Sequence, residues 1–348
     1  MKKVISTALV CLLMVSLMAC AAKPDSTTPA PAEQQTPSNS DKPATPKKTV
    51  TLSLNHVGAT DHPYQDGSLK FAELVEKKTN GSVKVDVFPS SQLASGAKAI
   101  EFVQMGTLDV ALESTMSLSN FVPEIGVLDM PFVFDSKEEA FRVLDGGFGK
   151  ELGTIAEKKG FKILGWWDNG FRTMSNSKRA ITQPSDLAGL KIRVPESKIF
   201  LATFEQLGAV PTPMAVSEVF TAIQLGTVDG QENTSANFFK NKYAEVNDYY
   251  SVTNHIYTAE PLIMSVDKFN SFTAEEQKAI MEAAKEAGVY QREVSTKLDE
   301  SLLKQIKDTG INVNIIEDLA AFKEAVQPVY KMFEAEFGTL LKKIDESK

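Results

Sequence analysis

The chain contains the same short pattern twice, as VQMGTLD at residues 103–109 and as IQLGTVD at residues 223–229. In each copy a helical segment ends at a glycine, which suits the left-handed conformation at helix C-termini, and a strand-forming segment follows. Strands that alternate with helices along the chain predict an α/β fold with a mostly parallel sheet. Because one copy lies in each half of the chain, the pattern also indicates two similar α/β lobes.

A polar residue stands seven positions after the glycine of each copy, Glu113 in the first and Asn233 in the second. Both positions are expected at the C-terminal ends of strands, where open α/β sheets bind their ligands. Each side chain could therefore face a cleft between the lobes. A capping or surface role is the alternative for both residues.

Two arginines lie within the segment 166–195, and apolar residues flank each of them. In the sequence KIRVP, the neighbours of Arg193 share one strand face and Arg193 occupies the other. Pro195 cannot donate to a sheet, so the strand is expected to stop there and to leave Arg193 near its C-terminal end. Arg172 follows Gly170 in a similar strand-to-loop setting.

A buried guanidinium keeps its charge, so each of these arginines needs an anion beside it. A ligand carboxylate could supply that anion through two parallel hydrogen bonds. The alternative is that Asp or Glu side chains pair with both arginines in structural salt bridges. Spacing alone does not separate the two possibilities.

The remaining pattern predicts where the helices and strands lie. Ser217 is expected to cap the helix that ends at Leu225. Pro328 is expected to divide the C-terminal region into two shorter helices. Strands are predicted at 49–55, 83–87, 108–112 and 161–164, and helices at about 64–79, 96–105, 136–144, 150–159 and 197–207.

The longest helical signal begins with a capping box at Thr273–Glu276 and ends at Gly310. About 35 residues at ~1.5 Å each give a length on the order of 50 Å, which is longer than one small domain is wide. We therefore expect this helix to span both lobes. The alternative is that Gly288 breaks it into two helices.

The N-terminus carries an export signal. Lys2 and Lys3 precede an apolar run at 4–18, and Cys20 follows Ala19. This order is typical of a bacterial lipoprotein, so residues 1–19 are predicted to be a signal peptide and Cys20 to carry lipid. An ordinary secretory leader is the alternative. Residues 20–48 are rich in proline and lack Val, Ile, Leu and aromatic residues, which predicts a disordered tether above a membrane.

The composition excludes several functions. The formal net charge is −8, and no basic run offsets it, which argues against nucleic acid as a partner. Both cysteines lie within the first 20 residues, so the body has no thiol for catalysis or metal binding. The three histidines His56, His62 and His255 lack metal-ligand spacing. No cofactor and no metal site is therefore expected.

The sequence also lacks the usual enzyme motifs. There is no GxSxG elbow, no Walker loop and no GxGxxG sequence. Asp229 and Glu232 could be imagined as the carboxylate pair of a glycosidase. A turn at Asp229–Gly230 explains the first of them more simply, so we expect a binding protein and not an enzyme.

Three segments resemble a known family. They are FPSSQL at 88–93, GFRTMSNSKRAITQPSDLAGLKIRVPES at 170–197 and GAVPTPMAVSEVFTAIQLGTVDGQEN at 208–233. The chain, over about residues 50–345, resembles the DctP-like solute-binding proteins of tripartite ATP-independent periplasmic (TRAP) transporters.

The resemblance implies an α/β fold of the periplasmic-binding-protein kind, with two lobes joined by hinge strands and a long helix that bridges both. Lobe I is then predicted at residues 49–169 plus 258–298, and lobe II at residues 170–257 plus 299–348. Closure of the lobes would bring residues of lobe I against a ligand held on lobe II.

The resemblance also implies a ligand site. Arg193 matches the family's principal carboxylate partner, Arg172 supports the same carboxylate, and Asn233 completes the clamp. Glu113 could accept a hydrogen bond from a ligand hydroxyl and repel an extra negative charge. The other positions that match pocket-lining residues of the family are Asn55 and Glu232.

Some positions depart from the relatives that bind sialic acid. Those relatives have Phe where Val216 stands, Arg where Met116 stands, and an Arg near Ala97. The departures argue against sialic acid and leave C4-dicarboxylates, sugar acids such as hexuronates, and other small hydroxy acids. Trp167 or its neighbour Trp166 could stack on a sugar-like ligand, because one of two adjacent strand residues faces away from the core.

The sequence therefore predicts a lipid-anchored receptor outside the cytoplasm, in the periplasm or at the cell surface. Its expected partners are a small carboxylate ligand, the membrane through its lipid, and the permease subunits of a TRAP transporter. The alternatives are a lipoprotein with a sensory or structural role and a binding protein for an ABC importer.

Overall fold

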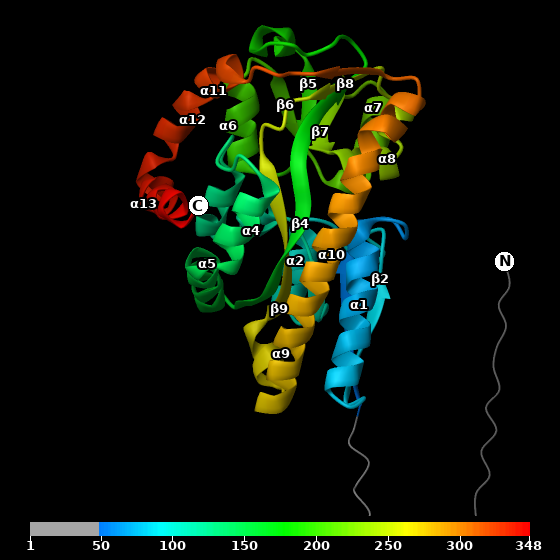
Figure 1. Cartoon of the computed structure of the whole chain (residues 1–348), viewed down its shortest axis with the longest axis vertical. Coiled ribbons are helices and arrows are strands. Elements are labelled where there is room, and N and C mark those ends of the chain that lie inside the picture. The colour runs from blue at the N-terminus through cyan, green and yellow to red at the C-terminus, as the bar shows by residue number, and fades with distance from the viewer. Residues whose placement is uncertain (1–48) are drawn as a thin grey trace, which may run out of the picture. The chain divides into compact units, whose positions relative to one another are not determined.

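The computed structural model describes residues 49–348, which belong to one compact unit, Lys47–Lys348. The predicted signal peptide at 1–19, the lipidation site Cys20 and the predicted tether at 20–48 lie outside the described residues. Strands and helices alternate along the unit, as Figure 1 shows, and this agrees with the predicted α/β class.

The predicted helices and strands all occur, but β6, β8, β9 and β10 were not predicted. The strands are β1 Val50–His56, β2 Val83–Phe88, β3 Val110–Leu112, β4 Phe161–Asn176, β5 Lys191–Val194, β6 Val210–Pro213, β7 Gly230–Thr234, β8 Tyr249–Val252, β9 Tyr257–Ser265 and β10 Asn312–Ile315. The α-helices are α1 Pro63–Lys78, α2 Ala97–Gln104, α3 Thr115–Leu118, α4 Lys137–Asp145, α5 Gly147–Lys158, α6 Lys198–Gln206, α7 Val219–Gln224, α8 Ser235–Lys240, α9 Val266–Asn270, α10 Ala274–Asp308, α11 Ala320–Ala325, α12 Gln327–Met332 and α13 Glu334–Ser347. The 3-10 helices are η1 Pro123–Asp129, η2 Pro184–Leu187, η3 Val216–Glu218 and η4 Tyr243–Glu245.

The sheet is mixed, and the prediction of a mostly parallel sheet was wrong. Its strand order is β2-β1-β3-β9-β4-β7-β5-β6, and β8 joins β4 to β10. Pairing is parallel on both flanks, where β1 lies between β2 and β3 and where β5 lies between β6 and β7. The middle is antiparallel, because β4 pairs antiparallel with β9, β9 pairs antiparallel with β3, and β4 pairs antiparallel with β7.

Strand β4 joins two lobes. Its first part pairs with β9 as far as Phe171, and from Arg172 onward it pairs with β7. The prediction that this strand ended at Leu164 and that Arg172 lay at a strand-to-loop junction was wrong, because the strand continues to Asn176. Gly170 has a φ of +110° and lies at a bulge, a conformation that glycine adopts without strain. The two-lobed fold was predicted correctly, and the residue bounds of the lobes stay a prediction.

Helix α10 is continuous over 35 residues and runs along both lobes in Figure 1. It begins at the predicted capping box, in which Thr273 and Glu276 exchange hydrogen bonds with each other's backbone. It packs against α1 and α8 and against β4. The prediction of one long helix is confirmed, and the alternative of a break at Gly288 was wrong.

Trp167 explains why a glycine stands inside that helix. Its side chain is 1% exposed, and a Cβ at Gly288 would lie 3.0 Å from the indole ring. A Cβ at Gly67 of α1 would lie 2.7 Å from the same ring. The indole therefore fills the space that both helices leave by lacking a side chain. Gln291 of α10 fixes the neighbouring backbone, since its side chain accepts from Asp168 N and donates to Asp168 O, both at 2.8 Å.

The two repeated segments adopt the same local structure. Gly106 and Gly226 have φ values of +71° and +70°, in the left-handed region, after α2 and α7 respectively. Asp109 then accepts a hydrogen bond from a backbone amide of β1 at 2.8 Å, and Asp229 accepts one from a backbone amide of β5 at 2.9 Å. Each copy thus attaches its strand to the neighbouring parallel strand in the same way.

Two smaller predictions differ from the structure. Ser217 does not cap a helix, because it lies within η3 and α7 begins two residues later without a side-chain cap. The C-terminal region holds three helices instead of two. Pro328 is in the first turn of α12, where a backbone N–H would have no intrahelical acceptor, so proline loses no helical hydrogen bond there.

Candidate functional site

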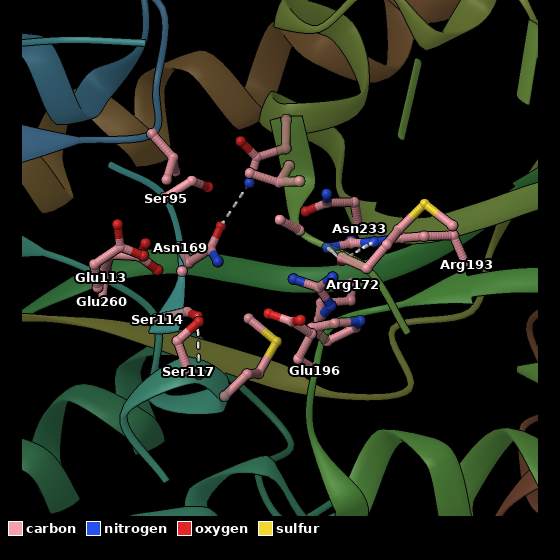
Figure 2. A pocket seen from close by; sticks show the side chains of 18 residues that line it. Ser95, Glu113, Ser114, Ser117, Asn169, Arg172, Arg193, Glu196, Asn233 and Glu260 are labelled. Carbon is pink, nitrogen blue, oxygen red and sulfur yellow. Dashed lines mark hydrogen bonds between the residues drawn. The ribbon is translucent and has the colours of Figure 1, made fainter. Parts of the chain in front are cut away.

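A cavity lies where β3, β5 and β7 end, and residues of both lobes line it (Figure 2). Its volume is about 50 Å³, which is room for several water molecules at roughly 10–15 Å³ each. One end holds the guanidinium groups of Arg172 and Arg193 with Asn233 and Glu196 beside them, and the other end is acidic, with Glu113 and Glu260. The predicted cleft residues Glu113 and Asn233 are therefore brought to the same cavity from opposite lobes.

Arg193 is a buried charge without a carboxylate partner. It lies at the C-terminal end of β5, as predicted, because Pro195 follows the strand. The residue is 3% exposed, and its guanidinium donates only to Met214 O, from Nε at 3.0 Å and from Nη2 at 2.7 Å. Within residues 49–348, no Asp or Glu forms an ion pair with it. Burial lowers the pKa of Arg193 to about 10, which still leaves the group charged at neutral pH.

Arg172 differs because Glu232 answers its charge. Nε donates to Glu232 Oε2 at 2.6 Å and Nη2 donates to Glu232 Oε1 at 2.8 Å, which is a two-pronged ion pair. Burial alone would raise the pKa of Glu232, but the charge and hydrogen bonds of Arg172 outweigh it and lower that pKa to about 2. Arg172 lines the cavity with its charge matched by Glu232, and its Nη1 group makes no hydrogen bond to the described residues.

His255 completes this buried group, and its role was not predicted from the sequence. Its Nε2 lies 3.3 Å from Glu232 Oε2, and its Nδ1 lies 2.8 Å from the hydroxyl of Thr253. Burial lowers the pKa of His255, so the ring is neutral and can donate a hydrogen bond to the carboxylate. Glu232 is thus held by two side chains and is not among the residues that line the cavity.

Asn233 presents an amide to the cavity. It belongs to β7, and its Oδ1 accepts from the backbone amide of Thr234 at 2.9 Å. That hydrogen bond fixes the orientation of the side chain and directs Nδ2 away from the backbone. The Nδ2 group makes no hydrogen bond to the described residues, and Asn233 lies near Arg193 in Figure 2.

Asn55 and Trp167 were predicted to contact the ligand, but neither lines the cavity. Asn55 accepts from Leu93 N at 3.1 Å and donates to Ala94 O at 2.9 Å, and it does not line the cavity. Its contacts hold the loop that presents Ser95, which does line it. Trp167 is buried between α1 and α10 and does not line the cavity, so the structure places no stacking surface there.

Glu260 is a cavity residue that the sequence analysis missed. It lies on β9, and its carboxyl group is 2% exposed. Burial raises the pKa of Glu260 to about 8. Burial and the nearby charge of Glu260 also raise the pKa of Glu113 well above its usual value. The available signal was a single acidic residue in the apolar strand segment TAEPLIM, which is unusual because buried charges are costly.

Two of the three positions that differ from the sialic-acid-binding relatives lie at the cavity. Met116 and Val216 line it, whereas Ala97 does not. The apolar side chains at these two positions line the cavity without adding charge. No group of His, Cys, Asp and Glu suited to a metal ion occurs among residues 49–348. The helices described over the same residues include none with the length and apolar character needed to cross a membrane.

Two α/β lobes that share long strands and enclose a charged cavity define a solute-binding protein. The chain belongs to the DctP family, described as bacterial extracellular solute-binding protein, family 7, whose model matches residues 54–336. A solute-binding protein of Verminephrobacter eiseniae is 40% identical and covers 85% of this chain and 88% of its own length. The resemblance to DctP-like solute-binding proteins is thereby confirmed.

Solved structures agree with this assignment. A TRAP periplasmic solute-binding protein from Polaromonas sp. JS666, bound to D-erythronate, is 39% identical with a TM-score of 0.83. The match covers 86% of this chain and 98% of that one. A second one, from Sulfurospirillum deleyianum with bound succinate, is 35% identical with a TM-score of 0.80, over 86% of this chain and 99% of that one. Both relatives hold an organic acid.

Proposed function

We propose that this chain is the receptor of a TRAP transporter and binds a small organic acid through Arg193 for delivery to the membrane permease. The observation that carries the proposal is the buried guanidinium of Arg193, which no carboxylate of residues 49–348 answers. A charge removed from water is costly unless an opposite charge compensates it. A ligand carboxylate in the cavity would supply that compensation.

Arg193, Asn233 and Arg172 have distinct parts in binding. Arg193 has donors that its two bonds to Met214 O do not use, and they can take a carboxylate oxygen. Asn233 offers its Nδ2 beside them. The charge of Arg172 is already matched by Glu232, so only its Nη1 group is left to support the ligand. The ligand carboxylate is therefore expected to bind Arg193 and Asn233 and to lie beside Arg172.

Closure of the lobes would complete the site. The acidic end belongs to β3 and β9, and the basic end belongs to β4, β5 and β7. A ligand that contacts both ends stabilises the closed arrangement by its greater affinity for that arrangement. Closure also excludes water, which strengthens the ion pair because the local dielectric constant falls.

The bound ligands of the relatives support an organic acid as the solute. One relative holds D-erythronate and another holds succinate, and each offers a carboxylate for a site such as Arg193. A relative from Rhodobacter capsulatus, 35% identical, is named as a C4-dicarboxylate-binding periplasmic protein. The relatives thus include binders of a hydroxy acid and of a dicarboxylate.

Isothermal titration calorimetry with and without the arginine tests the proposal. Wild-type protein is titrated with D-erythronate, succinate, galactonate and galacturonate, and the tightest ligand is then titrated into Arg193→Lys. The affinity should fall by about 2–5 kcal/mol, because lysine cannot reproduce the planar fork in a buried pair. A loss below ~0.5 kcal/mol would contradict the role of Arg193.

A matched arginine outside the cavity provides the control. Arg179 also donates only to main-chain carbonyl oxygens, those of Asp186 and Ala188, but its side chain is exposed. Arg179→Lys should therefore leave the affinity unchanged. If none of the acids binds wild-type protein, the alternative of a sensory or structural lipoprotein is favoured.

A further inference from the structure

The middle of the cavity carries two amide side chains that the proposed carboxylate clamp does not use. Asn169 lies on β4 shortly before Arg172, and Figure 2 shows it between Glu260 and Arg172. Asn237 lies in α8, directly after β7. Both residues line the cavity, and they are only 7% and 6% exposed. A ligand that extends from the arginines toward the acidic end would therefore pass these amides.

A closed set of hydrogen bonds holds the two amides in place. Asn237 Nδ2 donates to Asn169 Oδ1 and to Thr234 Oγ1, each at 3.1 Å. The hydroxyl group of Thr234 in turn donates to Asn169 Oδ1 at 3.2 Å. Both hydrogen atoms of Asn237 Nδ2 are thus used, and neither amide can rotate alone without breaking two of these bonds. The set therefore fixes which atom of each amide is left for other partners.

One acceptor and one donor remain at the cavity. Asn237 Oδ1 makes no hydrogen bond among the residues that the structure describes. Asn169 Nδ2 lies near the carboxyl group of Glu260: burial raises the pKa of Glu260 to about 8, and the amide of Asn169 is among the groups that partly offset this rise. That carboxyl group can take one of the two hydrogen atoms of Nδ2, which leaves the other for a ligand.

We propose that Asn169 and Asn237 determine specificity by recognising hydroxyl groups on the carbon atoms next to the ligand's carboxylate. A hydroxyl group can donate to Asn237 Oδ1 and accept from Asn169 Nδ2, whereas a methylene group can do neither. The inference rests on the proposed function, because the carboxylate must bind at Arg193 for these carbon atoms to lie in the middle of the cavity. The ligand is then a polyhydroxy monocarboxylic acid.

The burial of the two amides gives this recognition its strength. A cavity of about 50 Å³ is largely filled by a small acid, so little water remains to replace a missing hydroxyl group. A ligand without that group leaves a buried donor or acceptor unpaired, which lowers affinity by about 10-fold or more for each group. The amides thereby select against deoxy acids of the same charge and length.

Matched acids test the inference by calorimetry on the wild-type protein. D-erythronate and 4-hydroxybutanoate have the same length and the same single carboxylate, but the second acid lacks the hydroxyl groups on the two middle carbon atoms. D-erythronate should bind about 100-fold tighter, because two buried hydrogen-bonding groups lose their partners in the other complex. Galactonate and its 2,3-dideoxy analogue form the equivalent six-carbon pair. The contribution of Arg193 cancels in each ratio, because both acids present the same carboxylate.

Substitution of either amide should reduce this preference. Asn237→Ala removes the free acceptor and also a donor that holds Asn169, so the ratio of the two affinities should shrink about 10-fold, and Asn169→Ala should act similarly. Affinity for 4-hydroxybutanoate should change little, because that acid does not use the amides. A purely structural role would instead weaken both acids equally.

Asn247 provides a matched control. It is also a buried amide, and it accepts from Ser175 Oγ at 2.8 Å and donates to Val246 O at 3.0 Å, but it does not line the cavity. Asn247→Ala should therefore leave the ratio unchanged. If the variants at Asn169 and Asn237 do not fold, the wild-type ratio decides the inference alone.

The possible outcomes separate this inference from the proposed function. Equal affinity for a hydroxy acid and its deoxy analogue would overturn the inference and leave the receptor function intact. Binding of succinate without binding of either hydroxy acid would do the same. A full preference that survives in Asn169→Ala and in Asn237→Ala would overturn the assignment to these amides. No binding of any acid would overturn both the inference and the proposed function.

Discussion

At the residue scale, two buried arginines of this chain have opposite surroundings, because one has a carboxylate partner in the protein and the other has none among the described residues. Arg172 is matched by Glu232, so the protein itself satisfies its charge. Arg193 donates only to a backbone carbonyl, so part of its fork is left for another molecule. The sequence suggested the same role for both, because Glu232 lies 60 residues from Arg172 and their pairing is set by the sheet.

Removing the partner of Arg172 should be costly. Glu232→Gln leaves a buried guanidinium without its counter-charge, which is expected to lower the free energy of unfolding by about 3–5 kcal/mol. Urea unfolding of the variant and wild type measures this. Asp308→Asn is the control, because the Lys304–Asp308 pair is exposed and should contribute about 0.5 kcal/mol or less. A similar small loss in both variants would contradict a structural role for the buried pair.

The pH dependence of that difference follows from the lowered pKa of Glu232. Since its pKa is about 2 in the folded chain and roughly 4.3 in an unfolded one, its ionised form favours folding. The gap in stability between wild type and Glu232→Gln should be full above about pH 5 and shrink as the pH falls toward 2. Urea unfolding in a pH series checks this. A gap that grows on acidification would show that the assignment of the charge is wrong.

At the scale of elements, β4 shows where sequence reasoning met its limit. A strand was predicted to end at Leu164 and a loop to begin near Gly170, but Gly165 and Gly170 lie at irregularities in the pairing of one continuous strand, β4, with β9. A glycine inside a strand marks either an end or a bulge, and the choice depends on a partner strand distant in sequence. Local signals such as the capping box of α10 and the glycine after α2 were sufficient, because their hydrogen bonds are local too.

The packing of α1 and α10 against Trp167 predicts an unusual response to alanine. Gly67→Ala places a methyl group 2.7 Å from the indole and 2.8 Å from Gln291. Overpacking of this kind should cost about 1–3 kcal/mol, more than the helix propensity gained. Gly153→Ala in α5 has nothing within 4 Å of the new methyl group and should instead stabilise by about 0.5–1 kcal/mol. Thermal unfolding of both variants measures the two signs, and a stabilised Gly67→Ala would refute the tight contact.

The candidate site was predictable in part. Arg193 and the paired positions Glu113 and Asn233 followed from strand ends and from the repeated segment, and the structure brings all three to the cavity. Glu260 was not predicted, because only the pairing of β9 with β3 and β4 brings it to the same space. Asn55 supports a loop beside the cavity instead of lining it, a distinction that needs side-chain geometry.

At the scale of the whole molecule, the chain combines a body of the extracellular solute-binding family with an N-terminal segment that lies outside the described residues. The sequence there predicts cleavage before Cys20 and a lipid on that residue. A lipidated receptor stays on a membrane surface when it carries a second attachment or several acyl chains, as one chain alone binds weakly. The anchor would keep the receptor close to its permease.

Substitution of that cysteine tests the anchor. Cys20→Ser removes the only thiol available for acylation after the predicted signal peptide, so the protein should move from the membrane fraction to the soluble extracytoplasmic fraction. Cell fractionation followed by immunoblotting measures the distribution, and Ser26→Ala in the adjoining segment is the control that should stay with the membrane. Retention of Cys20→Ser protein on the membrane would contradict lipid anchoring.

The most direct test of the central claim is a crystal structure of the chain grown with D-erythronate. We expect the ligand carboxylate within hydrogen-bond distance of Arg193 and of Asn233 Nδ2, with the rest of the ligand extending toward Glu113 and Glu260. It would be contradicted by a ligand bound elsewhere, with Arg193 still donating to Met214 O alone and the cavity between the lobes filled only by water.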